Sequence, residues 1–401
     1  MNSYVQGKSA RFKESVYGRI SLIMFLRFGA MGLSGPFINV YFTKLGFSAA
    51  QLGVLISISA LAELILIPFL NRMADRLGQH RRLYVVMIWV ISLANMGFGL
   101  LTGRWILNLL FLFNRLLGRG SMSLLMQLTL TRFDQMGKNL LARTRMWGSI
   151  GWIVATTLSG FLLRLGDYPL LFIVSGLVSL PIVFLVSGAL PKRTTDDADG
   201  QPTEAVPRRA GFYILSASAF MYFLGLSGMA AFVWIFIEDL GVPSDQLGNY
   251  AAFFAVCELL PMLFMDKIID RLGAWAVFSM GMVGMATVWL TYSFIVNPHW
   301  ILALQLVRGM AFTMYTIGIT VMVARASAPA NVATNQALIQ VTMPGLASLL
   351  ISPILGWTYD NVGHDWMWRL CALFAFIGAT ILIMNRRRLA ADQIKAKPAV
   401  S

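Results

Sequence analysis

The chain alternates long apolar runs with short breaks of glycine, proline and charged residues. Each run is close in length to the roughly 20 mostly apolar residues that a helix needs to cross a lipid bilayer. The pattern predicts an all-α membrane protein with twelve transmembrane helices. They are expected near residues 18–43, 49–71, 83–102, 105–130, 145–165, 169–190, 211–237, 245–266, 274–296, 299–325, 332–357 and 365–385.

The composition supports this reading. Hydrophobic residues make up 57% of the chain and charged residues only 12%, whereas soluble domains carry about 25% charged residues. The first apolar run follows several basic residues, but it is too long for a cleaved signal and lacks a small-residue cleavage site. We therefore expect it to be kept as the first span.

Lysines and arginines gather in every second connection between the predicted spans. On the other side lie only Lys44, Arg104, Arg164 and Arg369. Cytoplasmic loops carry the excess of positive charge in membrane proteins, so both termini are expected to be cytoplasmic, in a bacterial inner membrane. The net charge of +14 thus reflects topology, and we expect no nucleic-acid partner.

The two parts of the chain resemble each other. Residues 45–78 align without gaps with residues 240–273, and both copies contain Leu-Gly, Gln-Leu-Gly, Glu-Leu and Asp-Arg-Leu-Gly. Such a repeat predicts two six-helix halves of one topology, with substrate bound near the membrane midplane between them. The expected parts are an N-terminal half (1–190), a cytoplasmic linker (191–210), a C-terminal half (211–390) and a cytoplasmic tail (391–401).

A charged loop lies between the second and third predicted spans, with the sequence Asn71-Arg-Met-Ala-Asp75-Arg76-Leu-Gly78-Gln-His-Arg81-Arg82. It resembles the loop motif of the major facilitator superfamily, with Asn71 in place of the first glycine. A weaker copy, Asp266-Lys-Ile-Ile-Asp270-Arg271-Leu-Gly273, lies in the second half. The resemblance covers essentially the whole chain. It implies a secondary transporter whose two halves rock about a central site.

The charged residues of these loops are candidates for gating. At cytoplasmic helix ends, acids can cap helices and pair with basic groups of the other half. Such pairs would hold the outward-facing state. The alternative is that the basic residues only anchor the loops on the cytoplasmic side. The candidate gating residues are Asp75, Arg76, Arg145, Asp270 and Arg271.

Residues 143–152, at the start of the fifth span, are similar to the matching stretch of lactose permease and of phenylpropionate-permease-like proton symporters. Glu258 also resembles a residue of these symporters. In lactose permease the arginine that matches Arg145 acts with a glutamate eighteen residues upstream to hold a galactoside. That position is Gln127 here, so the carboxylate is missing. Residues 151–160 contain no proline, unlike drug–proton antiporters, which favours import.

Four arginines and two glutamates lie well inside the predicted spans, away from their ends, where a charge costs about 2.5–3.5 kcal/mol on insertion scales. Arg27 and Glu63 have matching depths in neighbouring spans, so we expect a pair that is either structural or part of the coupling machinery. Arg115 and Arg119 share one helix face, and Arg308 has a corresponding place in span ten. The candidate substrate-binding residues are Arg27, Arg115, Arg119, Arg308 and Gln127. For Arg115 and Arg119, a structural pair with Glu63 or Glu258 is the alternative.

Glu258 and its repeat counterpart Glu63 are the candidates for proton coupling. Burial disfavours the charged form of a carboxyl group, and a nearby arginine favours it. A carboxyl group whose surroundings change as the carrier opens to either side can therefore load a proton on one side and release it on the other. Glu258 is the first candidate of the two.

Other residue types indicate no catalysis. The chain has no phosphate-binding glycine loop, no nucleophile elbow and no His-Glu-x-x-His pattern, so we expect no enzyme activity, no cofactor and no metal. Cys257 and Cys371 are expected to be small buried side chains, and His80, His299 and His364 to be solvated or interfacial. Residues that can line a cavity are Asn39, Tyr222, Trp234, Trp289, Gln305, Tyr315, Gln340 and Trp357.

Together these features predict a proton-coupled symporter for a small organic anion. The four intramembrane arginines against two glutamates would leave a net positive cavity, and a small aromatic acid is one candidate solute. The alternatives are a neutral sugar or nucleoside symporter, a proton-driven efflux antiporter and, as a minor one, a transporter-like sensor. The expected partners are the solute, the proton and membrane lipid, and the protein is expected to be a monomer.

Overall fold

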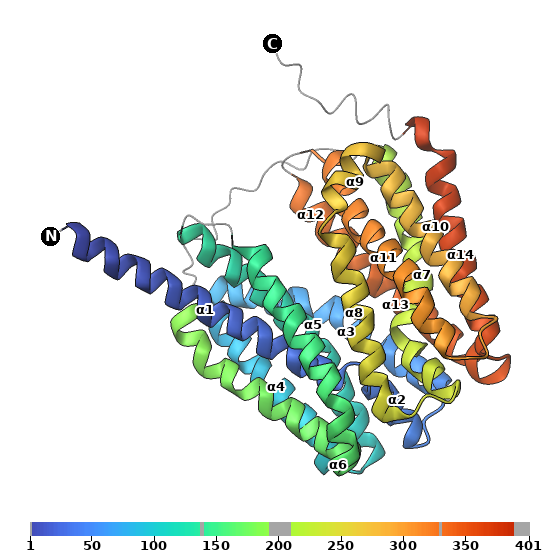
Figure 1. The fold of residues 1–401 in the computed structure, drawn as a ribbon, viewed down its shortest axis with the longest axis horizontal. Coiled ribbons are helices and arrows are strands. Elements are labelled where there is room, and N and C mark those ends of the chain that lie inside the picture. Colours follow the sequence, from blue (N-terminus) through green and yellow to red (C-terminus); the bar gives the residue numbers. More distant parts are fainter. Residues whose placement is uncertain (1, 137–139, 192–209, 329–330, 389–401) are drawn as a thin grey trace. The chain divides into compact units, whose positions relative to one another are not determined.

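The computed structural model describes residues 2–136, 140–191, 210–328 and 331–388. Within these ranges the chain forms helices and connecting turns, and no strand is present (Figure 1). The all-α prediction is confirmed. The predicted tail, and residues 192–209 of the predicted linker, lie outside the described residues.

The helices follow one another with short connections. The first six elements are α1 (Asn2–Ser34), α2 (Ile38–Lys44), α3 (Ala49–Leu77), α4 (His80–Leu100), α5 (Arg104–Gln135) and α6 (Leu141–Ala189). The next five are α7 (Ala210–Asp239), α8 (Ser244–Met262), α9 (Met265–Leu272), α10 (Ala274–Tyr292) and α11 (His299–Ala326). The last four are α12 (Val332–Ala337), the π-helical turn η3 (Leu338–Thr342), α13 (Met343–Asn361) and α14 (His364–Met384).

These helices account for the twelve predicted spans. Nine of the described helices are long and apolar enough to cross a membrane. One of them, Arg143–Ala189, contains two predicted spans. They join at Gly166 and Asp167, which have non-helical backbone angles. The helices α5 and α8 complete the set, and both carry charged residues within their length.

Three predicted spans are not continuous helices. The first breaks between α1 and α2 at Gly35-Pro36, where proline has no N–H to donate. The eighth is divided into α8 and α9 shortly after Pro261. The eleventh changes from α12 through the π-helical turn η3 to α13, which has Pro344 in its first turn.

The helices group into two compact units. Unit 1 comprises Met1–Tyr41, Ile65–Gly200 and Pro243–Ala252, and unit 2 comprises Phe42–Leu64, Gln201–Val242 and Phe253–Ser401. Each unit therefore includes a short segment from the other part of the sequence. The predicted division into halves at 1–190 and 211–390 stays a prediction.

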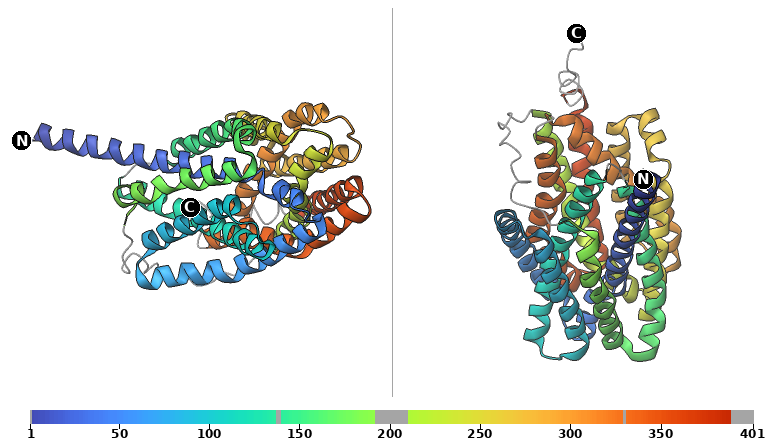
Figure 2. Two further views of the ribbon diagram at one scale, coloured as in Figure 1. Left: turned by 90° about the horizontal axis from the view of Figure 1, so that it is seen from below. Right: turned by 90° about the vertical axis from the view of Figure 1, so that its left-hand side faces the viewer.

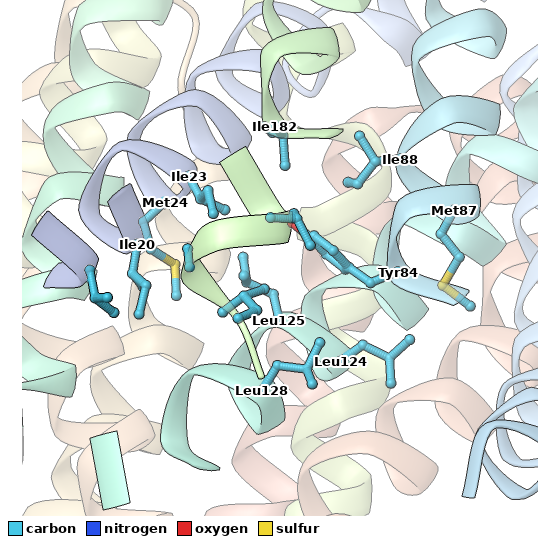
Figure 3. Close-up of a cluster of buried hydrophobic side chains, with 14 of the residues drawn as sticks. Ile20, Ile23, Met24, Tyr84, Met87, Ile88, Leu124, Leu125, Leu128 and Ile182 are labelled. Atoms are coloured by element: carbon cyan, nitrogen blue, oxygen red, sulfur yellow. The ribbon is translucent and has the colours of Figure 1, made fainter. Parts of the chain in front are cut away.

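In unit 1, α6 packs along α1 and α4, and α4 packs against α5. Apolar side chains of α1, α4 and α5 meet in a buried cluster around Tyr84, with Ile20, Met24, Ile88 and Leu125 close by (Figure 3). The spacing of these residues places them on one face of each helix. Burial of this cluster holds the helices that carry Arg27 and Arg115.

In unit 2, α10 packs against α11 and α14, and α7 packs against α13 and α14 (Figure 2). Its interior is aromatic. The Tyr222 and Tyr315 rings stack with centroids 3.8 Å apart, and Trp289 stacks on Tyr222 at 5.4 Å. These side chains are almost fully buried, so their place is in the helix core. The two cysteines are also buried, as predicted.

Each unit contains a close helix crossing of the same kind at the predicted periplasmic end. In unit 1, a side chain at Gly248 of α8 would collide with the backbone carbonyl of Thr156 in α6. A side chain at Gly160 of α6 would likewise collide with the carbonyl of Asp245. The Asp245 carboxylate pairs with Arg164 at 3.4 Å. Glycine lets the two backbones approach this closely.

In unit 2, the corresponding crossing joins α3 and α13. Gly53 lies against the carbonyl of Ser352, and Gly356 lies against the carbonyl of Ala49. The Asp360 carboxylate accepts hydrogen bonds from the backbone N–H groups of Ala49 at 3.0 Å and Ala50 at 2.7 Å. A carboxylate from α13 therefore caps the first turn of α3.

Candidate functional site

The clearest arrangement of charged groups is an ion pair within unit 2. Arg308 of α11 donates from Nη2 to Oε1 of Glu258 of α8, at 2.6 Å. The Arg308 side chain is 2% exposed, whereas that of Glu258 is 28% exposed. A buried guanidinium thus faces a carboxylate that solvent can reach. The structure brings these two predicted residues together.

Other groups surround the Arg308 guanidinium. Nε donates to the Gln305 side-chain oxygen, and the guanidinium carbon lies 4.4 Å from the centre of the Phe254 ring. The sulfur of Met229 lies 3.9 Å from Nη1. Gln305 in turn donates to the Tyr292 hydroxyl at 2.9 Å. The hydrogen bonds and the aromatic face fix the orientation of the arginine.

The local helix packing explains why the ion pair forms. Gly309 follows Arg308, and a side chain there would collide with the carbonyl of Cys257. The backbones of α8 and α11 therefore touch one residue away from both charged groups. The Thr313 hydroxyl also donates to the Glu258 carbonyl at 3.0 Å. This contact sets the register between the two helices.

This geometry makes the site responsive to protonation. An ionised Glu258 pairs with Arg308, and a neutral Glu258 would leave the buried arginine without its negative partner. The role of Glu258 in proton coupling stays a prediction.

Arg27 forms a second site in unit 1. Its Nη2 donates to the Gly118 carbonyl at 3.1 Å and to the Ser121 hydroxyl at 3.0 Å, both in α5. Arg27 is 3% exposed, and its Nε has no hydrogen-bond partner among the described residues. Both of these hydrogen bonds of the buried cation go to neutral groups. A charge in this setting favours a nearby anion.

The remaining predicted substrate residues lie along α5. Arg115 is partly buried, with its guanidinium 5.5 Å from the Phe111 ring centre. Arg119, Ser123 and Gln127 follow at four-residue intervals and are all exposed. An exposed polar stripe in a membrane-spanning helix favours a water-facing side, because polar groups are costly in lipid. Their contact with substrate stays a prediction.

Glu63 of α3 is buried and belongs to unit 2. Its predicted partner, Arg27, belongs to unit 1. The pair would join the two units and stays a prediction, as does the role of Glu63 in coupling.

The gating candidates lie near helix ends. Asp75 contacts His80 at 2.7 Å, within unit 1. Arg76, Arg145, Asp270 and Arg271 are exposed. Their predicted contacts between the sequence halves stay predictions. Gly78 and Gly273, which end the two repeat copies, both have positive φ angles, so the glycine that follows Asp-Arg-Leu reverses the chain in both loops.

The prediction that His80 is solvated or interfacial was wrong. The residue is 2% exposed and its Nε2 contacts Asp75. Asp75 lies in the last turn of α3 and His80 begins α4, so the intervening turn at Gly78 brings them together. The five-residue spacing of an acid and a histidine around a turn-forming glycine was the signal for this contact.

Sequence reasoning also missed Phe254 and Met229 beside Arg308. Aromatic and methionine side chains are common in any membrane helix, so neither residue type pointed to the site. Only the packing of α7 and α8 against α11 distinguishes these two from their neighbours.

Comparison with known proteins places the chain in a family. A model of the MFS_1 like family matches residues 17–370. The chain belongs to the major facilitator superfamily. It is therefore an integral membrane protein of a transporter family, as the loop motifs between its second and third spans predict.

Within the superfamily, the chain is 23% identical to the raffinose permease of Escherichia coli, over 88% of each protein. It is 21% identical to the quinolone resistance protein NorA of Staphylococcus aureus, over 44% of this chain and 46% of that protein. The second match thus spans about half of the length of NorA.

Solved structures show the same fold. The nucleoside transporter NupG superposes with a TM-score of 0.74 at 18% identity, covering 92% of this chain and 98% of NupG. The POT family transporter PepTSo has a TM-score of 0.74 at 10% identity, covering 95% of this chain and 98% of PepTSo. These similarities concern the fold alone.

Proposed function

We propose that the protein is a proton-coupled symporter that imports a small organic anion by alternating access. The observation that carries this proposal is the contact between Glu258 and Arg308. It combines a solvent-accessible carboxyl group with a buried cation inside the membrane-spanning helices. Protonation of Glu258 would release Arg308, and ionisation would restore the pair. Such a switch can link a proton to the movement of a solute.

The charge of the solute is inferred from Arg27. This arginine is buried, and its described hydrogen bonds go to a carbonyl and a hydroxyl group. Moving a cation from water into an apolar environment without a negative partner costs free energy. A carboxylate of the solute would supply the missing negative charge. Arg115, Arg119 and Gln127 would extend the binding face along α5.

The proposal also includes the orientation of the protein in the membrane. The distribution of lysine and arginine supports cytoplasmic termini in a bacterial inner membrane. Asp75, Arg76, Arg145, Asp270 and Arg271 would then form contacts at the cytoplasmic side in one state of the cycle, and Glu63 would assist coupling as the repeat counterpart of Glu258.

The central experiment is to reconstitute the full chain in liposomes and replace Glu258 with glutamine. Glutamine has nearly the same shape but cannot exchange a proton. Uptake of radiolabelled propionate driven by an acid-outside pH gradient is compared with counterflow, which needs no net proton movement. We expect E258Q to reduce accumulation at least about tenfold more than it reduces counterflow. A matched control is Asp365→Asn, a half-exposed acid that pairs with His364 among the described residues.

The proposal fails if E258Q accumulates propionate to the wild-type level under the same gradient. It also fails if accumulation in the wild type does not respond to the pH gradient. Sodium dependence is checked in parallel by exchanging sodium for choline, since a sodium requirement would replace the proton as the coupling ion.

A neutral sugar or nucleoside is the second candidate solute. It is favoured by the similarity to raffinose permease across most of the chain and by the fold shared with NupG. Galactose and uridine, tested as counterflow substrates beside propionate, separate the two. Uptake of either neutral solute without carboxylate uptake would replace the anion in the proposal. Efflux is the alternative direction, and one partial match is with a protein named for quinolone resistance. Efflux would appear as proton-driven accumulation of the solute inside inverted vesicles, whose outer face is the cytoplasmic one.

A further inference from the structure

Span eleven contains a polar cluster that the proposed coupling site does not use. Gln336 of α12 and Gln340 of the π-helical turn η3 face Thr320 of α11. We call these three residues the glutamine cluster. The Gln336 amide donates to the Thr320 carbonyl at 2.7 Å, and the Gln340 amide donates to the Thr320 hydroxyl at 3.1 Å and to the Gln336 side-chain oxygen. Turns of π-helix are rare and occur frequently at functional sites.

The backbone carbonyl of Thr320 fixes the orientation of both amides. A carbonyl can only accept, so Gln336 must present its NH₂ group to Thr320 and its oxygen to Gln340. Gln340 must then present its own NH₂ group to Gln336 and Thr320. Among the described residues, this leaves the Gln340 side-chain oxygen without a donor and one Gln336 N–H without an acceptor. The cluster therefore has one acceptor and one donor left for a ligand.

The position of the cluster favours contact with water. Gln340 and Thr320 are exposed, although both lie in membrane-spanning helices. Polar groups are costly against lipid, so exposed amides in a membrane-spanning helix favour a water-facing side.

The unused groups select a particular chemistry. A hydroxyl group both donates and accepts, so it can bond to the Gln340 oxygen and the Gln336 N–H together. A carboxylate only accepts and would leave the Gln340 oxygen unsatisfied. A hydrocarbon would leave both amides without partners, which costs binding energy.

The cluster is separate from the Glu258–Arg308 contact. Thr320 follows Arg308 by twelve residues on α11, which corresponds to about 18 Å along the helix. A small solute cannot reach both at once. The cluster would meet the solute at a different stage, nearer to the predicted cytoplasmic end of the same helix.

We propose that Gln336 and Gln340 form a second solute subsite that binds a hydroxyl group, so that the transported anion is a hydroxylated carboxylate such as a sugar acid. The inference rests on the proposed function, which supplies the carboxylate, and adds the hydroxyl. Gln340 accepts from the solute hydroxyl and Gln336 donates to it. Asn335, which donates to Ser327 at 2.8 Å, holds α12 in place beside α11.

The experiment compares uptake of gluconate, propionate and galactose by liposomes that contain the full chain. Gln340→Leu and Gln336→Leu are the test variants. The control is Thr334→Val, an exposed polar residue of α12 outside the cluster. We expect each test variant to raise the ratio of the half-saturation concentration for gluconate to that for propionate about three- to tenfold, the loss that accompanies one hydrogen bond. The control should keep the wild-type ratio.

The outcomes separate this inference from the proposed function. An unchanged ratio in both test variants, or wild-type uptake of propionate without gluconate, overturns the hydroxyl subsite and leaves proton-coupled anion uptake standing. Uptake of galactose alone overturns the anionic solute, and a weaker galactose affinity in Q340L then supports the hydroxyl subsite. Uptake of none of the three solutes overturns both. Melting temperatures of all variants exclude a folding defect as the cause.

Discussion

The two close helix crossings share a backbone contact and differ in their charges. The Gln-Leu-Gly triplet that repeats in the sequence places Gly53 in one crossing and Gly248 in the other. At the first, α3 has no acid in its first turn and receives Asp360 from α13. At the second, α8 carries its own acid, Asp245, and α6 provides Arg164.

The difference shows which part of the repeated crossing allows variation. The helices approach so closely that only glycine fits, so this residue is common to both copies. A helix N-terminus needs a negative group nearby, but either helix can supply it. The acid therefore comes from the partner helix at the first crossing and from the helix's own first turn at the second.

Replacement of the crossing glycines should cause the largest loss of stability. A leucine at Gly53 or Gly248 would collide with a backbone carbonyl, which cannot move aside without separating the helices. We expect each substitution to cost at least about 1–3 kcal/mol of stability and to lower the melting temperature of the purified protein. Gly18→Leu, where a side chain meets open space, is the control. If leucine were tolerated at one crossing but not at the other, the two crossings would not be structurally equivalent.

Asp360 should come next. Replacement with alanine removes a carboxylate that accepts two backbone hydrogen bonds at the start of α3. The expected cost is about 1–2 kcal/mol, as for other helix caps. Differential scanning fluorimetry of D360A beside D365A measures it, since Asp365 lies in a neighbouring turn and pairs with His364 among the described residues. Equal melting temperatures for the two variants would show that the cap does not stabilise the crossing.

Arg164 should show the smallest effect. Its side chain is 70% exposed and its distance to Asp245 is 3.4 Å. Ion pairs of this kind contribute about 0.2–1 kcal/mol and are screened by salt. Arg164→Gln should therefore change the melting temperature less than D360A, and the change should shrink in high salt. If Arg164→Gln lowered the melting temperature more than D360A, the Arg164–Asp245 pair would contribute more stability than the Asp360 cap.

The sequence was sufficient for the number and type of helices, because apolar length and basic loops report on the membrane directly. It was not sufficient for the breaks near Pro36, Pro261 and Pro344. A proline within a span can kink a helix, end it or be accommodated, and the neighbouring helices decide which.

Glu258 and Arg308 were candidates from the sequence, but the contact between them was not predicted. Glu258 and Arg308 stood out because charged residues within a span are rare. That they contact each other depends on the approach of α8 and α11 at Gly309, between residues about 50 positions apart. Which groups of the glutamine cluster donate hydrogen bonds and which accept them likewise depends on the Thr320 atom that each amide contacts. Contacts of this kind have no local pattern in the sequence.

The membership of residues 42–64 in unit 2 has a consequence for biosynthesis. Ser57 bonds to the carbonyl of Leu349 in α13, a residue 292 positions further along the chain. Asp360, which caps α3, is translated later still. The early part of α3 thus enters the bilayer long before its packing partner leaves the ribosome. Its backbone at Gly53 stays uncovered until nearly the whole polypeptide is made. Insertion and final assembly are therefore separate steps, and slow synthesis of the last spans would prolong the interval in which this segment is open to misassembly or proteolysis.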